Sequence, residues 1–177
     1  MSEQPGPEPS ETPVPPLPAM ISSERLRLIP ISPADAVDMI AGRHQDRWHR
    51  DYPRRDDVDA ASMTRNGDTW GARHVVLGHL AVGSIGCYGP PVDGETEVGY
   101  GLVEDARGAG VATEALRLLV AETDRLGVRL RASVRPDNRA SVRVLAKCGF
   151  TELRGSDEDG NLVMARPLPA APVAPAG

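Results

Sequence analysis

The chain is short of cysteine, aromatic residues and lysine. Among 177 residues it has two cysteines, one phenylalanine and, in Lys147, a single lysine. Cys87 and Cys148 occupy apolar positions without metal-ligand spacing, so we expect both to lie in the core. The few aromatic residues and the formal net charge of −5 argue against a nucleic-acid-binding protein, which needs stacking rings and a basic surface.

Long apolar runs are also missing. No run approaches the roughly eighteen residues that a membrane helix needs, and no basic segment followed by an apolar one opens the chain. We therefore expect a soluble, cytoplasmic protein that has neither a membrane nor a nucleic acid as its partner.

Both ends of the chain are rich in proline. Residues 1–20 hold seven prolines and little to bury, and residues 169–177 repeat a Pro/Ala bias. Such segments cannot bury enough apolar surface to offset the entropy lost on ordering, so we expect both to be disordered tails. Residues 22–168 suffice for one domain with its own core and are too few for two.

Between the tails, short alternating segments and amphipathic segments follow one another in a mixed order. The patterns predict strands at 24–31, 73–77, 80–88, 95–103, 130–134, 150–154 and 161–166. They predict helices at 32–40, 59–64, 112–126 and 138–148. This order indicates an α/β fold of the α+β kind, a mixed sheet with helices on its faces, rather than a run of βαβ repeats.

The segment most informative about function precedes the helix at 112–126. It reads Arg107-Gly108-Ala109-Gly110-Val111-Ala112. Glycine allows a tight turn and a close approach to a ligand, and the first N–H groups of a helix have no intrahelical acceptor. The positive end of the helix dipole makes such a loop suitable for pyrophosphate. An ordinary turn and cap has the same pattern, and the residues match neither a P-loop nor the dinucleotide fingerprint.

The context of this loop resembles the GNAT N-acetyltransferase superfamily. Arg107-x-x-Gly110-x-Ala112 matches that family's Arg/Gln-x-x-Gly-x-Gly/Ala signature, and the strand at 97–103 is similar to its fourth strand. Asn138-x-x-Ser141, followed by Lys147-x-Gly149-Phe150, is similar to its second CoA-contacting segment. The resemblance covers about residues 22–168.

Two further segments resemble one branch of that superfamily. Residues 23–28, SERLRL, and residues 83–86, GSIG, are similar to the branch that includes ribosomal-protein N-terminal acetyltransferases. Members of the superfamily are often homodimers.

The resemblance implies a mostly antiparallel central sheet, splayed between strands four and five, with helices on both faces. Here these strands are 97–103 and 130–134. It also implies acetyl-CoA as cosubstrate and no metal. Backbone groups of Leu102 and Val103 would pair with the pantetheine arm in the splay, as in β-augmentation. The residues implied to bind the cofactor are Leu102, Val103, Arg107, Gly108, Ala109, Gly110, Val111, Ala112, Thr113, Asn138 and Ser141.

The implied reaction is direct attack of a primary amine on the thioester. An amine is largely protonated at neutral pH, so a base must first remove a proton. We expect Glu97, at the start of the strand beside the splay, to be that base. Glu158, His74 and His79 are the alternatives.

Two alternatives are open for the leaving thiolate: it departs without an acid, because a CoA thiolate is a tolerable leaving group, or a side chain protonates it. Many relatives have a tyrosine for this purpose where this chain has Leu145, so the pattern is not met there. Ser141 is the remaining hydroxyl on the expected helix face, and we predict this role for it. Its alternative role, like that of Asn138, is to cap the helix that begins here.

The sequence says least about the acceptor amine. The loop at 43–57, with Trp48, His49 and Tyr52, and the acidic turn at 156–160 are expected to wall its site. The acids of that turn would favour a cationic amine. Three functions remain open: acetylation of a peptide α-amino group, acetylation of a small-molecule amine, and a non-catalytic acyl-CoA-binding module.

Overall fold

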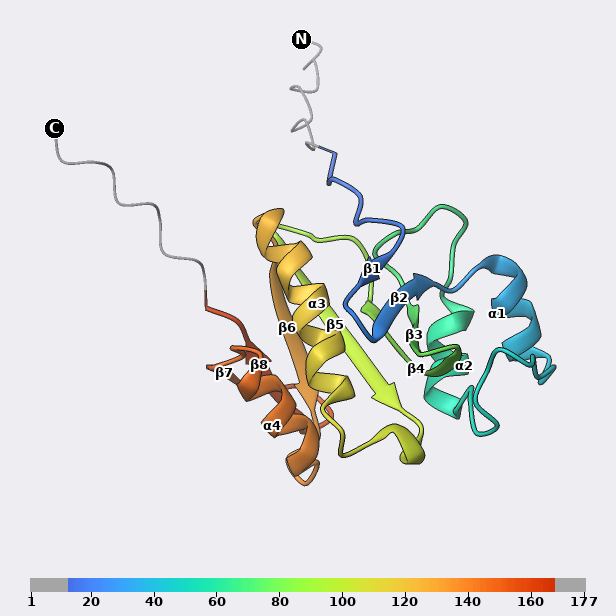
Figure 1. Ribbon diagram of the computed structural model, residues 1–177. Coiled ribbons are helices and arrows are strands. Elements are labelled where there is room, and N and C mark those ends of the chain that lie inside the picture. Colours follow the sequence, from blue (N-terminus) through green and yellow to red (C-terminus); the bar gives the residue numbers. More distant parts are fainter. Residues whose placement is uncertain (1–12, 168–177) are drawn as a thin grey trace, which may run out of the picture.

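The computed structural model describes residues 13–167, which form an eight-stranded sheet with helices on both faces (Figure 1). The sheet order is β1-β2-β3-β4-β5-β6-β8-β7. The strands are β1 (Ile21–Ser22), β2 (Leu26–Pro30), β3 (Arg73–Leu77), β4 (Leu80–Cys87), β5 (Glu95–Leu102), β6 (Arg129–Val134), β7 (Glu152–Ser156) and β8 (Leu162–Ala165). The helices are α1 (Pro33–Ile40), α2 (Arg55–Ser62), η1 (Glu104–Ala106, a 3-10 helix), α3 (Val111–Arg125) and α4 (Arg139–Lys147).

The sheet is mixed, as the sequence predicts. Neighbouring strands pair antiparallel except β5 and β6, which are parallel. These two pair only where Glu95–Glu97 face Arg129–Arg131. Beyond Glu97 they diverge, which confirms the predicted splay. We call the space between Val98–Leu102 of β5 and Ala132–Val134 of β6 the slot.

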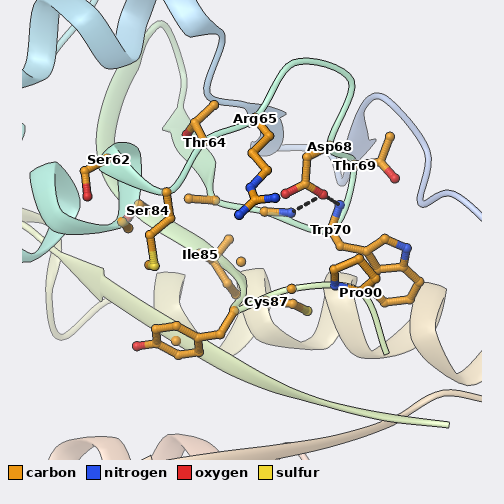
Figure 2. Close-up of a pocket in the computed structure, with 18 of the residues that line it drawn as sticks. Ser62, Thr64, Arg65, Asp68, Thr69, Trp70, Ser84, Ile85, Cys87 and Pro90 are labelled. Carbon is orange, nitrogen blue, oxygen red and sulfur yellow. Dashed lines mark hydrogen bonds between the residues drawn. The ribbon is translucent and has the colours of Figure 1, made fainter. Parts of the chain in front are cut away.

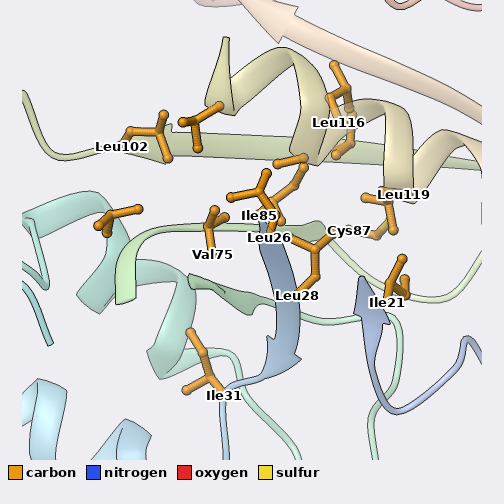
Figure 3. Close-up of a cluster of buried hydrophobic side chains, with 14 of the residues drawn as sticks. Ile21, Leu26, Leu28, Ile31, Val75, Ile85, Cys87, Leu102, Leu116 and Leu119 are labelled. Carbon is orange, nitrogen blue, oxygen red and sulfur yellow. The ribbon is translucent and has the colours of Figure 1, made fainter. Parts of the chain in front are cut away.

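The main core lies between the sheet and α3 (Figure 3). Leu116 and Leu119, from the apolar stripe of α3, pack onto Leu26, Ile85 and Leu102 of three strands. Fully burying a leucine side chain stabilises a fold by roughly 1.5–3 kcal/mol. This stripe therefore fixes α3, and with it the loop that leads into α3, against the centre of the sheet.

The predicted elements are mostly confirmed, and the largest error concerns α2. The sequence predicts that helix at 59–64, whereas it spans Arg55–Ser62. Its start is set by Arg54, whose N–H donates to the buried Asp57 carboxylate over 2.8 Å. The first turn of this helix consists of charged residues and has no apolar periodicity. The pattern therefore predicted the start of the helix four residues too late.

Part of the predicted N-terminal tail is packed on the domain. In residues 13–19, which we call the strap, Leu17 is only 2 % exposed, and its N–H donates to Thr69 Oγ1 over 3.0 Å. Trp70 Nε1 donates to the Pro15 carbonyl over 3.2 Å. The expectation of disorder is therefore wrong for this segment, because Leu17 finds a buried site that composition does not reveal. Residues 1–12 and 169–177 lie outside the described range.

Two smaller predictions can be compared with the structure. Cys87 and Cys148 are both buried and unpaired, as expected of core residues, and burial raises the pKa of the Cys87 thiol to about 12. Within residues 13–167, no helix is both long enough and apolar enough to cross a membrane.

Candidate active site

The slot presents one edge of β5 without a strand partner. Val103 donates its N–H to Val82 on the β4 side, and Glu97 accepts there from Tyr88, over 2.8 and 2.9 Å. In an antiparallel pair the direction of these groups alternates, so Val98, Tyr100 and Leu102 direct theirs into the slot. An extended ligand could pair with this edge as an added strand.

Of the two residues predicted to pair with pantetheine, only one faces the slot. The Leu102 carbonyl does so and accepts from Arg107 Nε over 3.1 Å. The backbone groups of Val103 are directed elsewhere, because its carbonyl accepts from Ala106 N–H over 3.1 Å and its N–H points toward β4. The chain turns into η1 immediately after Val103, so Leu102 is the better placed of the two residues.

The glycine loop lies at the start of α3. Gly108 and Gly110 have φ values of 81° and 74°, and Gly110 is the N-cap of the helix. Arg107 N–H is occupied, since it donates to the Glu104 carbonyl over 3.0 Å. The next three N–H groups of the loop, those of Gly108, Ala109 and Gly110, have no backbone acceptor in the described range, and neither do those of the first helical residues Val111, Ala112 and Thr113. Such a cluster suits an anion.

The first strand region holds this loop in place. Arg25 Nη2 donates to the Ala109 carbonyl over 3.0 Å, and its Nε donates to Glu114 over 2.6 Å. Ser23 Oγ donates to the same carboxylate. Arg25 and Ser23 belong to the segment that suggested the branch, but nothing in the sequence indicated that they contact the loop. They lie about ninety residues away in the chain from Glu114.

The start of α4 forms another wall of the slot. Asn138 caps the helix by accepting from Ser141 N–H over 3.1 Å, which is the capping role that the sequence suggested. Tyr100 of β5 reaches across and donates its hydroxyl to the Ser141 carbonyl over 3.3 Å. Burial raises the Tyr100 pKa to about 12, so the phenol is protonated at neutral pH. Leu145 is in the core and supplies nothing to the slot.

Glu97 lies on the last rung at which β5 and β6 still pair, beside the narrow end of the slot. Its Oε2 is 3.7 Å from Arg131 Nη2, too long for a hydrogen bond. The alternative candidates for the general base are less well placed than Glu97. His74 is buried and engaged with other side chains, whereas His79 and Glu158 are exposed on the β3–β4 and β7–β8 turns.

A cavity of about 1370 Å³ opens on the face of the sheet opposite α3 (Figure 2). Its walls come from the strap, from α2 and the loop at 63–72, and from β4. Gly99 and Tyr100 of β5 also line it, so the cavity reaches the strand that borders the slot. Figure 2 shows Arg65 and Asp68 on the loop beside Ile85 and Cys87 of β4.

The segment 43–57, expected to wall the acceptor site, contributes Arg54 and Asp56 to the lining of the cavity. The three residues named from the sequence do not line it. Trp48 and Tyr52 are 2 % and 1 % exposed and belong to the core, and His49 contacts Asp105 over 3.3 Å. Aromatic residues in a polar loop gave no sign of this burial.

The acidic turn at 156–160 likewise supplies no residue to the cavity. Asp157 accepts from the N–H groups of Asp159 and Asn161 and from the Asn161 side chain. These bonds hold the pKa of the Asp157 carboxyl below its usual value. Its charge is thus used to close its own hairpin.

The cavity has one fixed cation, which the sequence did not reveal. Arg54 donates Nε and Nη2 to Asp57 over 2.9 Å each, and Ser84 Oγ donates to the same carboxylate. Asp57 is fully buried. The guanidinium lies against Gly101, where an added Cβ would collide with it.

A second polar network lies next to it. His74, Ser84 and Gly101 share one rung across β3, β4 and β5. The His74 ring is 2.8 Å from the Tyr52 hydroxyl and 2.9 Å from Asp35, with its two nitrogens facing one partner each. Burial lowers the His74 pKa and raises that of Tyr52 well above its usual value. Through Tyr52, this network anchors the chain two residues before Arg54.

Comparisons with known proteins bear on the family and the fold of this chain. Residues 25–151 match the family model described as an acetyltransferase (GNAT) domain. A comparison of the sequence with curated proteins found no match.

Several solved structures share the fold. An acetyltransferase from Agrobacterium tumefaciens is 24 % identical with a TM-score of 0.58, covering 90 % of this chain and 98 % of its own. The GNAT domain of S. lividans PAT is 20 % identical with a TM-score of 0.59, covering 84 % and 94 %. The microcin self-immunity acetyltransferase MccE, solved with acetyl-CoA and AMP, is 17 % identical with a TM-score of 0.60, covering 81 % and 93 %.

Proposed function

The chain belongs to the GNAT acetyltransferase family, an acyltransferase family, and on that premise we propose that it transfers the acetyl group of acetyl-CoA to a primary amine. One observation carries the proposal. The slot, with an unpaired β5 edge, borders the α3 side, and the cavity reaches the same strand from the opposite face. Two substrates could therefore meet at β5 from opposite sides without competing for space.

The cofactor would enter from the α3 side. The free N–H groups from Gly108 to Thr113, together with the positive end of the α3 dipole, fit the pyrophosphate. The slot-facing groups of Leu102 and Tyr100 fit the amides of the pantetheine arm. Asn138 and Ser141 would border that arm from the start of α4. Bound acetyl-CoA supplies the thioester that the amine attacks.

Glu97 is proposed to accept the proton of the attacking amine. It is half-buried beside the narrow end of the slot, and no hydrogen bond in the described part of the chain occupies its carboxylate. On the other wall, the departing sulfur needs a proton donor or a hydrogen bond. Ser141 remains a candidate for this role, and the protonated Tyr100 hydroxyl beside it is a second.

A peptide α-amino group is the acceptor we favour. Ligand pockets for drug-sized molecules span roughly 300–1,000 Å³, and the cavity exceeds that range. The end of a peptide would fill it better than a small alkylamine. The branch resemblance of residues 23–28 and 83–86 points the same way.

Calorimetric titration with acetyl-CoA, with NADH and ATP as controls, tests the cofactor, and thiol release in the presence of short peptides tests the reaction. We expect acetyl-CoA alone to bind in the micromolar range, and Glu97→Gln to bind it normally while losing most turnover. Binding without turnover of any amine would support a non-catalytic acyl-CoA-binding protein instead. Absence of acetyl-CoA binding would refute the proposal.

A further inference from the structure

We infer that Arg54 selects acceptors in which the carbon next to the amine-bearing carbon carries an oxygen, that is, α-amino acyl compounds. This inference rests on the proposed function, because it concerns which amines the cavity accepts. The shared chemistry is a carbonyl or carboxylate oxygen beside a primary amine. Peptide N-termini, amino acid amides and free amino acids all have it, whereas simple alkylamines lack it.

The residues on the cavity face of β5 determine how Arg54, Tyr88 and Glu97 lie relative to one another. Side chains alternate along a strand, so Glu97, Gly99 and Gly101 share one face. An added Cβ at Gly99 would meet the Tyr88 hydroxyl at 2.7 Å, and one at Gly101 would meet the Arg54 guanidinium. The two glycines thus let Tyr88 and Arg54 lie against the strand, in line with Glu97.

Arg54 is held rigidly but keeps one donor group free. Asp57 takes its Nε and Nη2, and the planar guanidinium then fixes the direction of Nη1. Within residues 13–167, Nη1 has no hydrogen-bond acceptor. The side chain is 24 % exposed and lines the cavity. A ligand in the cavity can therefore reach this donor.

The charge of Arg54 is already balanced by buried Asp57. The site thus presents an oriented N–H rather than a net positive charge, which suits an amide carbonyl as well as a carboxylate. Three other charged residues of this wall, Asp56, Asp59 and Arg65, are exposed and have no fixed partner in the described structure. The fourth, Asp68, is an acceptor whose Oδ1 is engaged by the N–H groups of Trp70 and Gly71 over 2.9 and 3.2 Å. Among the described residues of the wall, Arg54 is therefore the cation whose donors are held in a fixed direction.

The spacing along β5 fits this chemistry. Gly99 and Gly101 are two residues apart, which is roughly 6.8 Å along a strand. In an α-amino acyl group the nitrogen and the oxygen are about 3 Å apart, and a hydrogen bond adds about 3 Å. An amine held at the Tyr88 hydroxyl, which lies against Gly99 between Glu97 and Gly101 on this face, would place its acyl oxygen next to Arg54.

The test compares acetyl transfer to alaninamide, alanine and isopropylamine, which share an amine-bearing carbon and differ in the neighbouring group. Amine basicity differs among them, so the readout is the ratio of kcat/KM for alaninamide to that for isopropylamine in each protein. Arg54→Lys retains a charge for Asp57 but loses the oriented donor. We expect it to lower this ratio by about tenfold, with acetyl-CoA affinity unchanged. Arg55→Lys, at an exposed neighbour outside the cavity lining, should leave the ratio unchanged.

Gly101→Ala is the second variant, because its Cβ must displace the guanidinium from the strand while residue 54 remains an arginine. It should lower the same ratio even if Arg54→Lys fails to fold. An unchanged ratio in a variant that still binds acetyl-CoA would overturn the inference, as would equal losses for both amines. The alanine arm shows whether a carboxylate is accepted as well as a carbonyl. No transfer to any amine by the unmodified protein would refute the proposed function instead.

Discussion

The two sides of β5 are built in different ways. The α3 side takes its proposed binding groups from two short segments, residues 100–113 and 138–141, and most of them are backbone N–H and C=O groups. The cavity side takes its groups from four separated parts of the chain, and the group proposed here to bind a ligand, Arg54, is a side chain. A site made of local backbone depends on a motif, whereas one made of distant side chains depends on the whole fold.

The largest expected effect of a substitution concerns the α3 side of β5. Gly110→Asp places a carboxylate where we propose the pyrophosphate, in a left-handed conformation that favours glycine. We expect acetyl-CoA affinity to fall by about 100-fold, which is about 2.7 kcal/mol, as measured by calorimetry.

Gly127→Asp is the matched control. Gly127 also has a positive φ, of 68°, and follows the other end of the same helix. It imposes similar backbone strain far from the loop, so acetyl-CoA affinity should be retained. Equal losses in both variants would mean that strain, rather than a phosphate site, explains the result.

The second largest expected effect concerns the cavity side of β5. Leu17→Ala removes the buried anchor of the strap, which is also a wall of the cavity. We expect a loss of about 2 kcal/mol in the free energy of unfolding, measured with urea. The KM of the acceptor should rise more than that of acetyl-CoA. Leu153→Ala, at an exposed position of β7, should change neither.

The smallest effect is a dependence of stability on pH. Burial lowers the His74 pKa, so between the folded value and the unfolded value near 6.5 only the unfolded chain binds the proton. Stability is therefore complete above the unfolded pKa and falls as the pH drops below it. We expect urea unfolding to show a loss of about 1 kcal/mol between pH 7 and 5.5.

His74→Gln should remove most of this slope, although it also lowers stability at every pH. His79→Gln, on the exposed β3–β4 turn, should keep it. A flat curve for the unmodified protein would show that the network around His74 tolerates a proton.

Sequence reasoning was successful where neighbouring residues decide the structure. The periodicity of 112–126 and the glycines before it predict α3 and its loop, because cap, turn and apolar stripe all lie within about twenty residues. Asn138 as a cap follows from the same local chemistry. The splay itself came from the family resemblance and not from any local pattern.

Sequence reasoning failed where tertiary contacts decide. Arg54 lies in a polar loop, and nothing in the sequence indicates that it packs on Gly101. Leu17 belongs to a proline-rich segment, and nothing in the sequence indicates that it is buried against the domain. Tyr100 is the one aromatic residue of its strand, and that was the only available hint of its contact with Ser141. Such pairings follow from strand order, which the sequence does not state.

The slot has a consequence for the behaviour of the protein in solution. Its β5 border is a strand edge of the kind that pairs with other strands and causes aggregation. Arg107 covers only the Leu102 carbonyl, so most of the edge remains available. A cosubstrate that binds there would also protect against self-association, because it stabilises the folded chain and occupies the edge. We expect light scattering on mild heating to decrease when acetyl-CoA is added.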